Sequence, residues 1–95
     1  MIKSFADPDT ELIYREGKSA KLSPNIHRSA LRKLRVLDAA TNIIDLKVPY
    51  GNHLEKLERE LAGQWSIRIN EQWRLCFEWD EKRGDAYHVY ITDYH

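Results

Sequence analysis

The sequence predicts an α+β fold in which two N-terminal helices pack on one face of an antiparallel β-sheet. Two helix-start signals, each an Asp or Ser followed by Pro, come before residue 40. After Gly63, apolar and polar residues alternate in three short segments, as they do in strands that bury one face. At 95 residues the chain is predicted to form one domain, residues 1–95, with a single modest core.

The N-terminal half is predicted to hold both helices. Asp7 is suited to the N-cap of the first, and Pro8 to its first helical position, where the missing N–H costs nothing. Gly17 predicts the end of this helix. The second helix is predicted to begin after Ser23-Pro24 and to run to about residue 40, because four apolar residues recur at helical spacing: Ile26, Ala30, Leu34 and Leu37.

Three shorter segments complete the expected order. Residues 2–5 are predicted to form an edge strand, and residues 42–46 predict a further helical turn. Residues 53–61 are predicted to be a link into the sheet. With the strands beyond this link, the expected order is β-α-α-β-β-β.

Parity fixes the register of the hairpin between residues 65 and 79. Only a loop with an odd number of residues, 70–72, gives both strands one shared apolar face, because a slip of one residue reverses every side chain. Arg68 then lies opposite Arg74 on the other face, which is predicted to stay open with both arginines exposed. Like charges in that position destabilise a sheet, so a neighbouring acid or a bound phosphate is expected, and the phosphate is favoured. The last strand is predicted at 86–92, where the apolar alternation continues with Tyr87, Val89 and Ile91.

Composition excludes several classes of protein. The net charge is zero, with 15 basic and 15 acidic residues, which argues against strong unassisted binding to free nucleic acid. Residues 15–35 are locally basic, and a solvated helix surface and a patch facing nucleic acid are about equally plausible there.

The sequence contains no apolar run of ~20 residues and no signal-like N-terminus, so no membrane association and a cytoplasmic location are expected. The single Cys76 is predicted to be buried as a small apolar residue. No cluster has metal-ligand spacing and no glycine-rich phosphate loop is present, so neither a metal nor a cofactor is expected.

Several short motifs, in this order, resemble a known family. They are Met1-Ile2-Lys3-Ser4-Phe5, Leu37-Asp38-Ala39-Ala40-Thr41, Gly51-Asn52-His53-Leu54-Glu55, Gly63-Gln64-Trp65-Ser66-Ile67-Arg68-Ile69-Asn70, Gln72-Trp73-Arg74 and Asp93-Tyr94-His95. Over essentially its full length the chain resembles the HigB-type toxins of the RelE/ParE superfamily, the toxin half of type II toxin–antitoxin modules. No single motif is unique, but their combination is quite specific.

This resemblance implies a RelE-like fold and cleavage of mRNA in the ribosomal A site. It also implies a HigA-like helix-turn-helix antitoxin that represses the shared operon, so that operator DNA is reached only through the antitoxin. The family's sheet arginine maps onto Arg74, with Arg68 as its cross-strand neighbour, and the family's terminal Asp-Tyr-His maps onto Asp93, Tyr94 and His95.

The family's loop histidine and lysine map less directly. They map onto His53 and Lys56 when a gap is placed before Trp65, whereas without the gap Glu58 occupies the lysine position. The Lys-Gly-Asp sequence that many members carry there is replaced by Glu58-Arg59-Glu60.

These residues are of the types that RNA cleavage without a metal requires. The reaction needs a base for the 2′-OH proton, a cation for the charge that grows on the phosphate, and an acid for the leaving 5′-oxygen. A histidine such as His95, with an ordinary pKa of about 6.5, suits either proton role. Arg74 and Arg68 offer a phosphate clamp, Tyr94 a stacking surface, and Asp93 a partner that orients His95 or an arginine. Because strand alternation turns Asp93 and His95 away from Tyr94, a bent terminus is expected.

Two other functions remain open at this point. One is a ParE-like toxin that inhibits DNA gyrase, which would not need a terminal histidine. The other is a degenerate member that acts mainly as an antitoxin-binding co-repressor, an alternative that the altered sequence at 58–60 keeps open.

Overall fold

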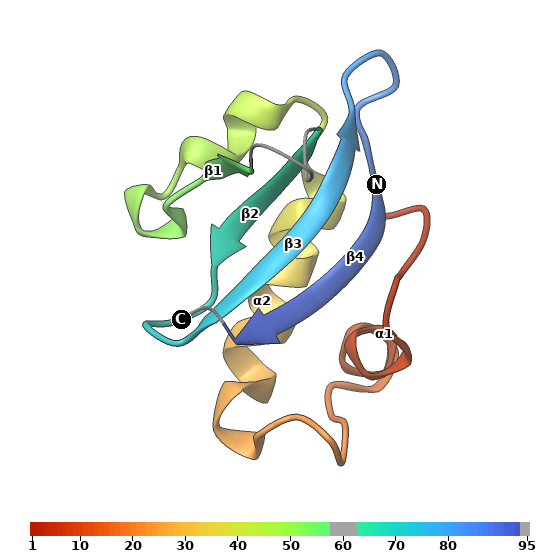
Figure 1. Ribbon diagram of the computed structural model, residues 1–95, viewed down its shortest axis with the longest axis vertical. Coiled ribbons are helices and arrows are strands. Elements are labelled where there is room, and N and C mark those ends of the chain that lie inside the picture. The colour runs from red at the N-terminus through yellow and green to blue at the C-terminus, as the bar shows by residue number, and fades with distance from the viewer. Residues whose placement is uncertain (58–62, 94–95) are drawn as a thin grey trace.

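The computed structural model describes residues 1–57 and 63–93. These ranges contain two α-helices and four strands (Figure 1): α1 (Pro8–Glu16), α2 (His27–Ala39), β1 (Glu55–Leu57), β2 (Gln64–Arg68), β3 (Trp73–Asp80) and β4 (Asp85–Asp93). Three short 3-10 turns lie between them: η1 (Pro24–Ile26), η2 (Ile43–Lys47) and η3 (Tyr50–Asn52). The strands form one antiparallel sheet in the order β1-β2-β3-β4.

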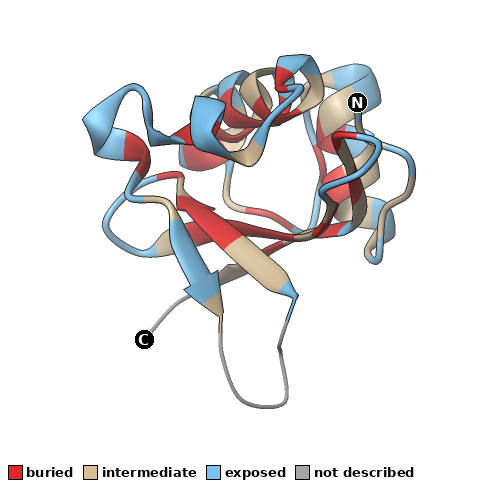
Figure 2. Ribbon diagram, turned by 90° about the horizontal axis from the view of Figure 1, so that it is seen from above, coloured by how far each residue is buried: buried red, intermediate tan, exposed pale blue. Residues whose placement is uncertain are grey.

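The expected α+β architecture is confirmed, because both helices lie on the same side of the sheet (Figure 2). The core lies between these layers. It includes Ile13 of α1 and the predicted stripe of α2, and the sheet adds Ile67, Leu75, Phe77, Val89 and Ile91. All four stripe residues are fully buried: Ile26 at the end of η1, and Ala30, Leu34 and Leu37 in α2.

The start and end signals of α1 act as predicted. The Asp7 side chain accepts a hydrogen bond from the Asp9 backbone N–H at 3.1 Å, and Pro8 is the first helical residue. Gly17 ends the helix with a φ of 81°, a left-handed conformation in which a residue without a Cβ is unstrained. The helical turn expected at 42–46 is η2, which is capped by the Asn42 side chain.

The N-terminal segment and β1 differ from the expectation. Residues 2–5 do not form a regular strand; they make two isolated parallel bridges to β4, Ile2 to Ala86 and Phe5 to Val89. One edge strand of the sheet is β1, inside the segment that was predicted to be only a link. Among the described residues, three of β1 pair with β2, which is too short a run for an alternation signal to be recognised.

The register predicted for the β2–β3 hairpin is correct. Trp65 pairs with Phe77, Ile67 with Leu75, and Arg68 with Arg74. The expectation for β4 was wrong at Tyr87. A bulge between Cys76 and Glu78 inserts one extra residue into β4, where His88 has a φ of 53°, so Tyr87 pairs with Glu78 and leaves the face that Val89 and Ile91 share.

Candidate functional site

Arg74 is buried, which corrects the expectation of an open arginine face. Its side chain is 7% exposed. Nε donates to the Ser66 Oγ at 2.9 Å, and Nη2 donates to the backbone carbonyls of His53 at 2.6 Å and Ser66 at 3.3 Å. Ser66 of β2 supplies two of these acceptors and the turn before β1 supplies the third. The contribution of this turn was not foreseen. A neighbouring acid, the less favoured of the two alternatives expected from the sequence, is present, because a Glu55 carboxylate oxygen lies 3.9 Å from Nη2.

Arg68 differs from its cross-strand neighbour. Its side chain is partly exposed, and its Nε donates to the Asn70 carbonyl at 3.1 Å. The two arginines therefore share one face of the hairpin, and within the described residues Arg74 alone of the pair is held by several acceptors from other strands and turns. Arg68 is the more accessible of the two.

The His53 turn connects η3 to β1. His53 has a φ of 43°, a left-handed conformation that is uncommon for residues other than glycine and persists only where the surroundings hold it. Its backbone N–H donates to the Tyr50 carbonyl at 3.1 Å, and its own carbonyl accepts from Arg74. The side chain is exposed, and its ring lies 5.4 Å from the Tyr50 ring.

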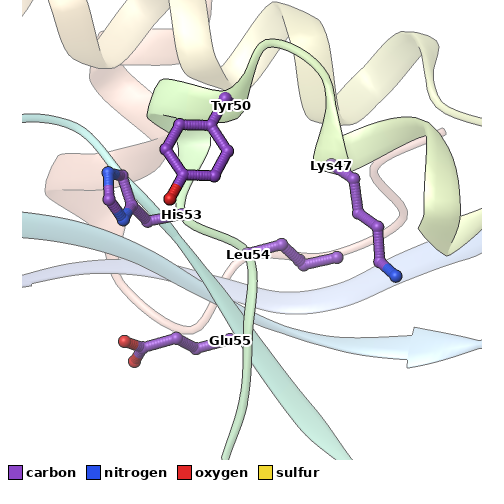
Figure 3. A pocket seen from close by; sticks show the side chains of 5 residues that line it. All are labelled: Lys47, Tyr50, His53, Leu54 and Glu55. Carbon is purple, nitrogen blue, oxygen red and sulfur yellow. The ribbon is translucent and has the colours of Figure 1, made fainter.

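An open pocket of about 310 Å³ lies beside this turn. It is lined by Lys47, Tyr50, His53, Leu54 and Glu55. Figure 3 shows the Tyr50 and His53 rings next to each other at one end of the pocket and Lys47 at the other. The hydrogen bond from the Arg74 guanidinium to the His53 carbonyl connects this pocket to the buried cation.

Asn52 and Lys33 hold the same turn from the helical side. Asn52 is fully buried, and its side-chain amide donates to the carbonyls of Leu46 at 3.2 Å and Val48 at 3.3 Å. Its Oδ1 accepts a hydrogen bond from Nζ of Lys33 on α2, a side chain that is itself 8% exposed. Burial lowers the pKa of Lys33, and nearby Arg32 lowers it further. The His53 turn is therefore anchored to α2 as well as to β3.

Four residues that make these contacts were not predicted from the sequence: Lys33, Ser66, Asn52 and Glu55. The sequence pattern does mark the positions of two of them, Lys33 and Ser66. Lys33 falls on the apolar stripe of α2, seven residues after Ile26, where a solvated lysine is not expected. Ser66 has the same strand parity as Arg68 and Arg74, which placed it on their face. Asn52 and Glu55 stand in the family motif Gly51-Asn52-His53-Leu54-Glu55, but no periodic pattern indicated their contacts, which depend on a turn.

Not all the predicted site residues come together. Lys56 pairs with Trp65 and so lies on the opposite face of β1 from Glu55, with its Nζ 5.6 Å from the centre of the Trp65 ring. Asp93 pairs with Trp73, and so by register it lies on the opposite face from Arg74; it accepts a hydrogen bond from Gln72 Nε2 at 2.9 Å. Tyr94, His95 and Glu58 lie outside the described residues.

Cys76 is buried, as the sequence predicted. Burial raises the pKa of its thiol, while a hydrogen bond with Tyr90 and the charge of Arg74 act in the opposite direction. A thiol of this kind is a packing group more than a nucleophile.

Within residues 1–57 and 63–93, no group of three or more His, Cys, Asp or Glu residues is arranged to hold a metal ion. Nor does any helix there have the length and apolar character needed to cross a membrane.

Comparison with known families decides the class of this protein. The family model described as "RelE-like toxin of type II toxin-antitoxin system HigB" matches residues 3–95. The chain belongs to the HigB-like toxin family. The resemblance read from the motifs is thus confirmed, and a HigB-like toxin of a type II system has an antitoxin as its partner.

Two curated relatives span nearly the whole HigB-like chain. It is 42% identical over 92 residues to "Toxin HigB-1" of Vibrio cholerae, covering 96% of this chain and 95% of the relative. It is 33% identical over 96 residues to "Endoribonuclease HigB" of Proteus vulgaris, covering both chains completely. A chain of the YoeB–YefM complex from Staphylococcus aureus has a TM-score of 0.57 at 20% identity, covering 100% of this chain and 95% of that one, which shows that the fold is shared.

Proposed function

We propose that this HigB-like toxin cleaves mRNA on the ribosome and so inhibits translation. The observation that carries the proposal is the full-length match to a relative named as an endoribonuclease. The geometry supports it, because a cation, a histidine turn and a pocket lie together on one part of the molecule. The zero net charge fits a toxin that depends on the ribosome for most of its positioning.

Arg74 would stabilise the charge that develops on the scissile phosphate. A guanidinium held by Ser66 and the His53 carbonyl is fixed before the reaction, so little reorganisation is needed when charge appears. Because the site is partly shielded from water, the field of this cation is stronger than it would be in bulk solvent. Arg68, His53 and Lys56 would contact flanking phosphates, with Lys56 approaching from the other face of β1.

His95 would carry the protons. In the proposed reaction a base removes the 2′-OH proton, the 2′-oxygen attacks phosphorus, and the bond to the 5′-oxygen breaks as that oxygen is protonated, which leaves a 2′,3′-cyclic phosphate. Asp93 would orient His95, and Tyr94 would contact the displaced nucleotide. Nothing in this scheme requires a metal or a cofactor.

The partner of this toxin would be a HigA-like helix-turn-helix antitoxin, and operator DNA would be reached only through it. The free toxin would act in the cytoplasm, where ribosomes and mRNA are available. The competing functions, gyrase inhibition and a co-repressor without catalysis, make different predictions in the same assay.

Purified toxin should cut mRNA on programmed ribosomes and leave naked RNA intact. The matched control is toxin preincubated with its antitoxin, which should not cut. Equal cleavage of naked RNA would overturn ribosome dependence. Gyrase-dependent DNA breaks without RNA cuts would favour the ParE-like alternative, and neither activity would favour the co-repressor.

A further inference from the structure

Tyr50 presents a large aromatic ring to solvent beside the pocket. The residue is 87% exposed and lines the pocket, whereas Val48, which is 73% exposed in the same segment, is not among the lining residues. Exposed apolar side chains are ordinary when they occur singly, so it is the position of Tyr50 at the pocket that indicates a binding role. An aromatic face of this kind is suited to stacking against another flat ring.

The pocket is chemically asymmetric. The Tyr50 and His53 rings are tilted by 48° with their centres 5.4 Å apart, so His53 flanks the Tyr50 ring without covering it. The Lys47 ammonium lies at the other end (Figure 3). The Glu55 carboxylate lines the pocket as well and is about half exposed. A phosphate would be repelled by Glu55, whereas an uncharged base would not.

We propose that this pocket holds one unstacked base of the A-site codon, stacked on Tyr50, with the adjoining phosphate directed toward Lys47. The inference rests on the proposed ribonuclease function. Unpaired bases of RNA are recognised by stacking on aromatic side chains, which tolerates different sequences because every base has a π-face. Tyr50 thereby becomes a substrate-binding residue that no sequence motif of the family indicated.

The anchoring of the His53 turn supports this placement. The Tyr50 carbonyl accepts from the His53 N–H, and the His53 carbonyl accepts from Arg74. Lys33 and Asn52 hold the same turn against α2. The segment that carries the Tyr50 ring is therefore hydrogen-bonded, through the His53 carbonyl, to the guanidinium of Arg74. A base stacked on Tyr50 would hold its nucleotide near that guanidinium.

The test compares Tyr50→Ala and Tyr50→Phe with Val48→Ala, a matched control at an exposed apolar position two residues away. Cleavage is measured on programmed ribosomes over a range of ribosome concentrations. A second measurement uses ribosomes programmed with 2′-O-methylated mRNA, which cannot be cut, carrying fluorescent 2-aminopurine at each position of the A-site codon in turn. Stacking on an aromatic ring quenches this probe. Antitoxin binding is measured for every variant.

Tyr50→Ala should lower kcat/KM by about tenfold or more, the scale of one lost base stack, and should abolish the toxin-dependent quench at one codon position. Tyr50→Phe and Val48→Ala should keep both. All three should melt within about 4 °C of the wild type, because exposed side chains contribute little to stability. Tyr50→Ala that cleaves as well as Val48→Ala overturns the proposal. So does a loss of cleavage with the quench unchanged, or a loss of antitoxin binding alone. If the wild type cuts no RNA at all, the proposed function itself fails.

Discussion

Substituting each arginine of the Arg68–Arg74 pair separates a structural role from a surface one. In Arg74→Ala, three hydrogen bonds to Ser66 Oγ, the Ser66 carbonyl and the His53 carbonyl are lost. Ser66 is fully buried, so water does not replace these bonds without rearrangement. At roughly 1 kcal/mol for each hydrogen bond lost, the free energy of unfolding should fall by about 3 kcal/mol.

Arg68→Ala is the matched control, since it removes the same charge from the position directly across the hairpin. Arg68 is partly exposed and its side chain donates to the nearby Asn70 carbonyl, so its loss should change stability by no more than about 0.5 kcal/mol. In a domain of this size 1 kcal/mol corresponds to roughly 4–8 °C in Tm. Arg74→Ala should therefore melt roughly 12–24 °C below the wild type, and Arg68→Ala within about 4 °C of it.

The assay is thermal unfolding followed by circular dichroism, with urea unfolding as a second measure of free energy. Equal and small shifts for both variants would refute the reasoning, because they would mean that the contacts of Arg74 contribute nothing. The result also decides how activity data for Arg74→Ala are interpreted. The cleavage rate must be divided by the fraction of protein that is folded, and only the loss that remains after this correction is a catalytic effect. Arg74→Lys, which retains the charge but not the planar fork of donors, gives a milder test.

Three further outcomes follow from the anchored turn and the terminal histidine. Asn52→Ala should lower stability by about 2 kcal/mol or more, because it leaves Lys33 and two carbonyls without their partner, and denaturant unfolding that shows no loss would contradict this. Burial lowers the pKa of Lys33 from 10.5, so the unfolded chain keeps the Lys33 proton to higher pH than the folded protein does. The free energy of unfolding, relative to that of Lys33→Met, should therefore rise with pH between the lowered pKa and about pH 10.5. A difference in free energy that does not change with pH would show that the pKa of Lys33 is not lowered. His95→Ala should slow single-turnover cleavage strongly. When the wild-type rate is measured from about pH 5.5 to about pH 8.5, its pH profile should bend at about pH 6.5. Profiles of the same shape and height would remove His95 as the proton carrier.

The sequence predicted well those parts of the fold that a periodic pattern controls. The cap at Asp7, the stop at Gly17 and the hairpin register that sets Arg68 against Arg74 all follow from local rules. Tyr87 was misplaced because the bulge at His88 reverses parity, and a bulge leaves no clear trace in a single sequence.

The candidate site was predicted less completely. Parity placed Arg74 on the correct face, but its burial depends on three-residue pairing by β1 and on a turn fixed by Asn52, and both are tertiary effects. The roles of Asp93, Tyr94 and His95 rest on the family motif alone and stay predictions. The exposure of Tyr50 could be seen only once η3 was placed beside the pocket.

Mapping mRNA 5′ ends in cells that express the toxin without its antitoxin tests the central claim most directly. The account predicts new 5′ ends within translated reading frames, absent when the antitoxin is expressed as well and strongly reduced for His95→Ala. Growth arrest with no new 5′ ends, or new ends spread equally over translated and untranslated RNA, would contradict it.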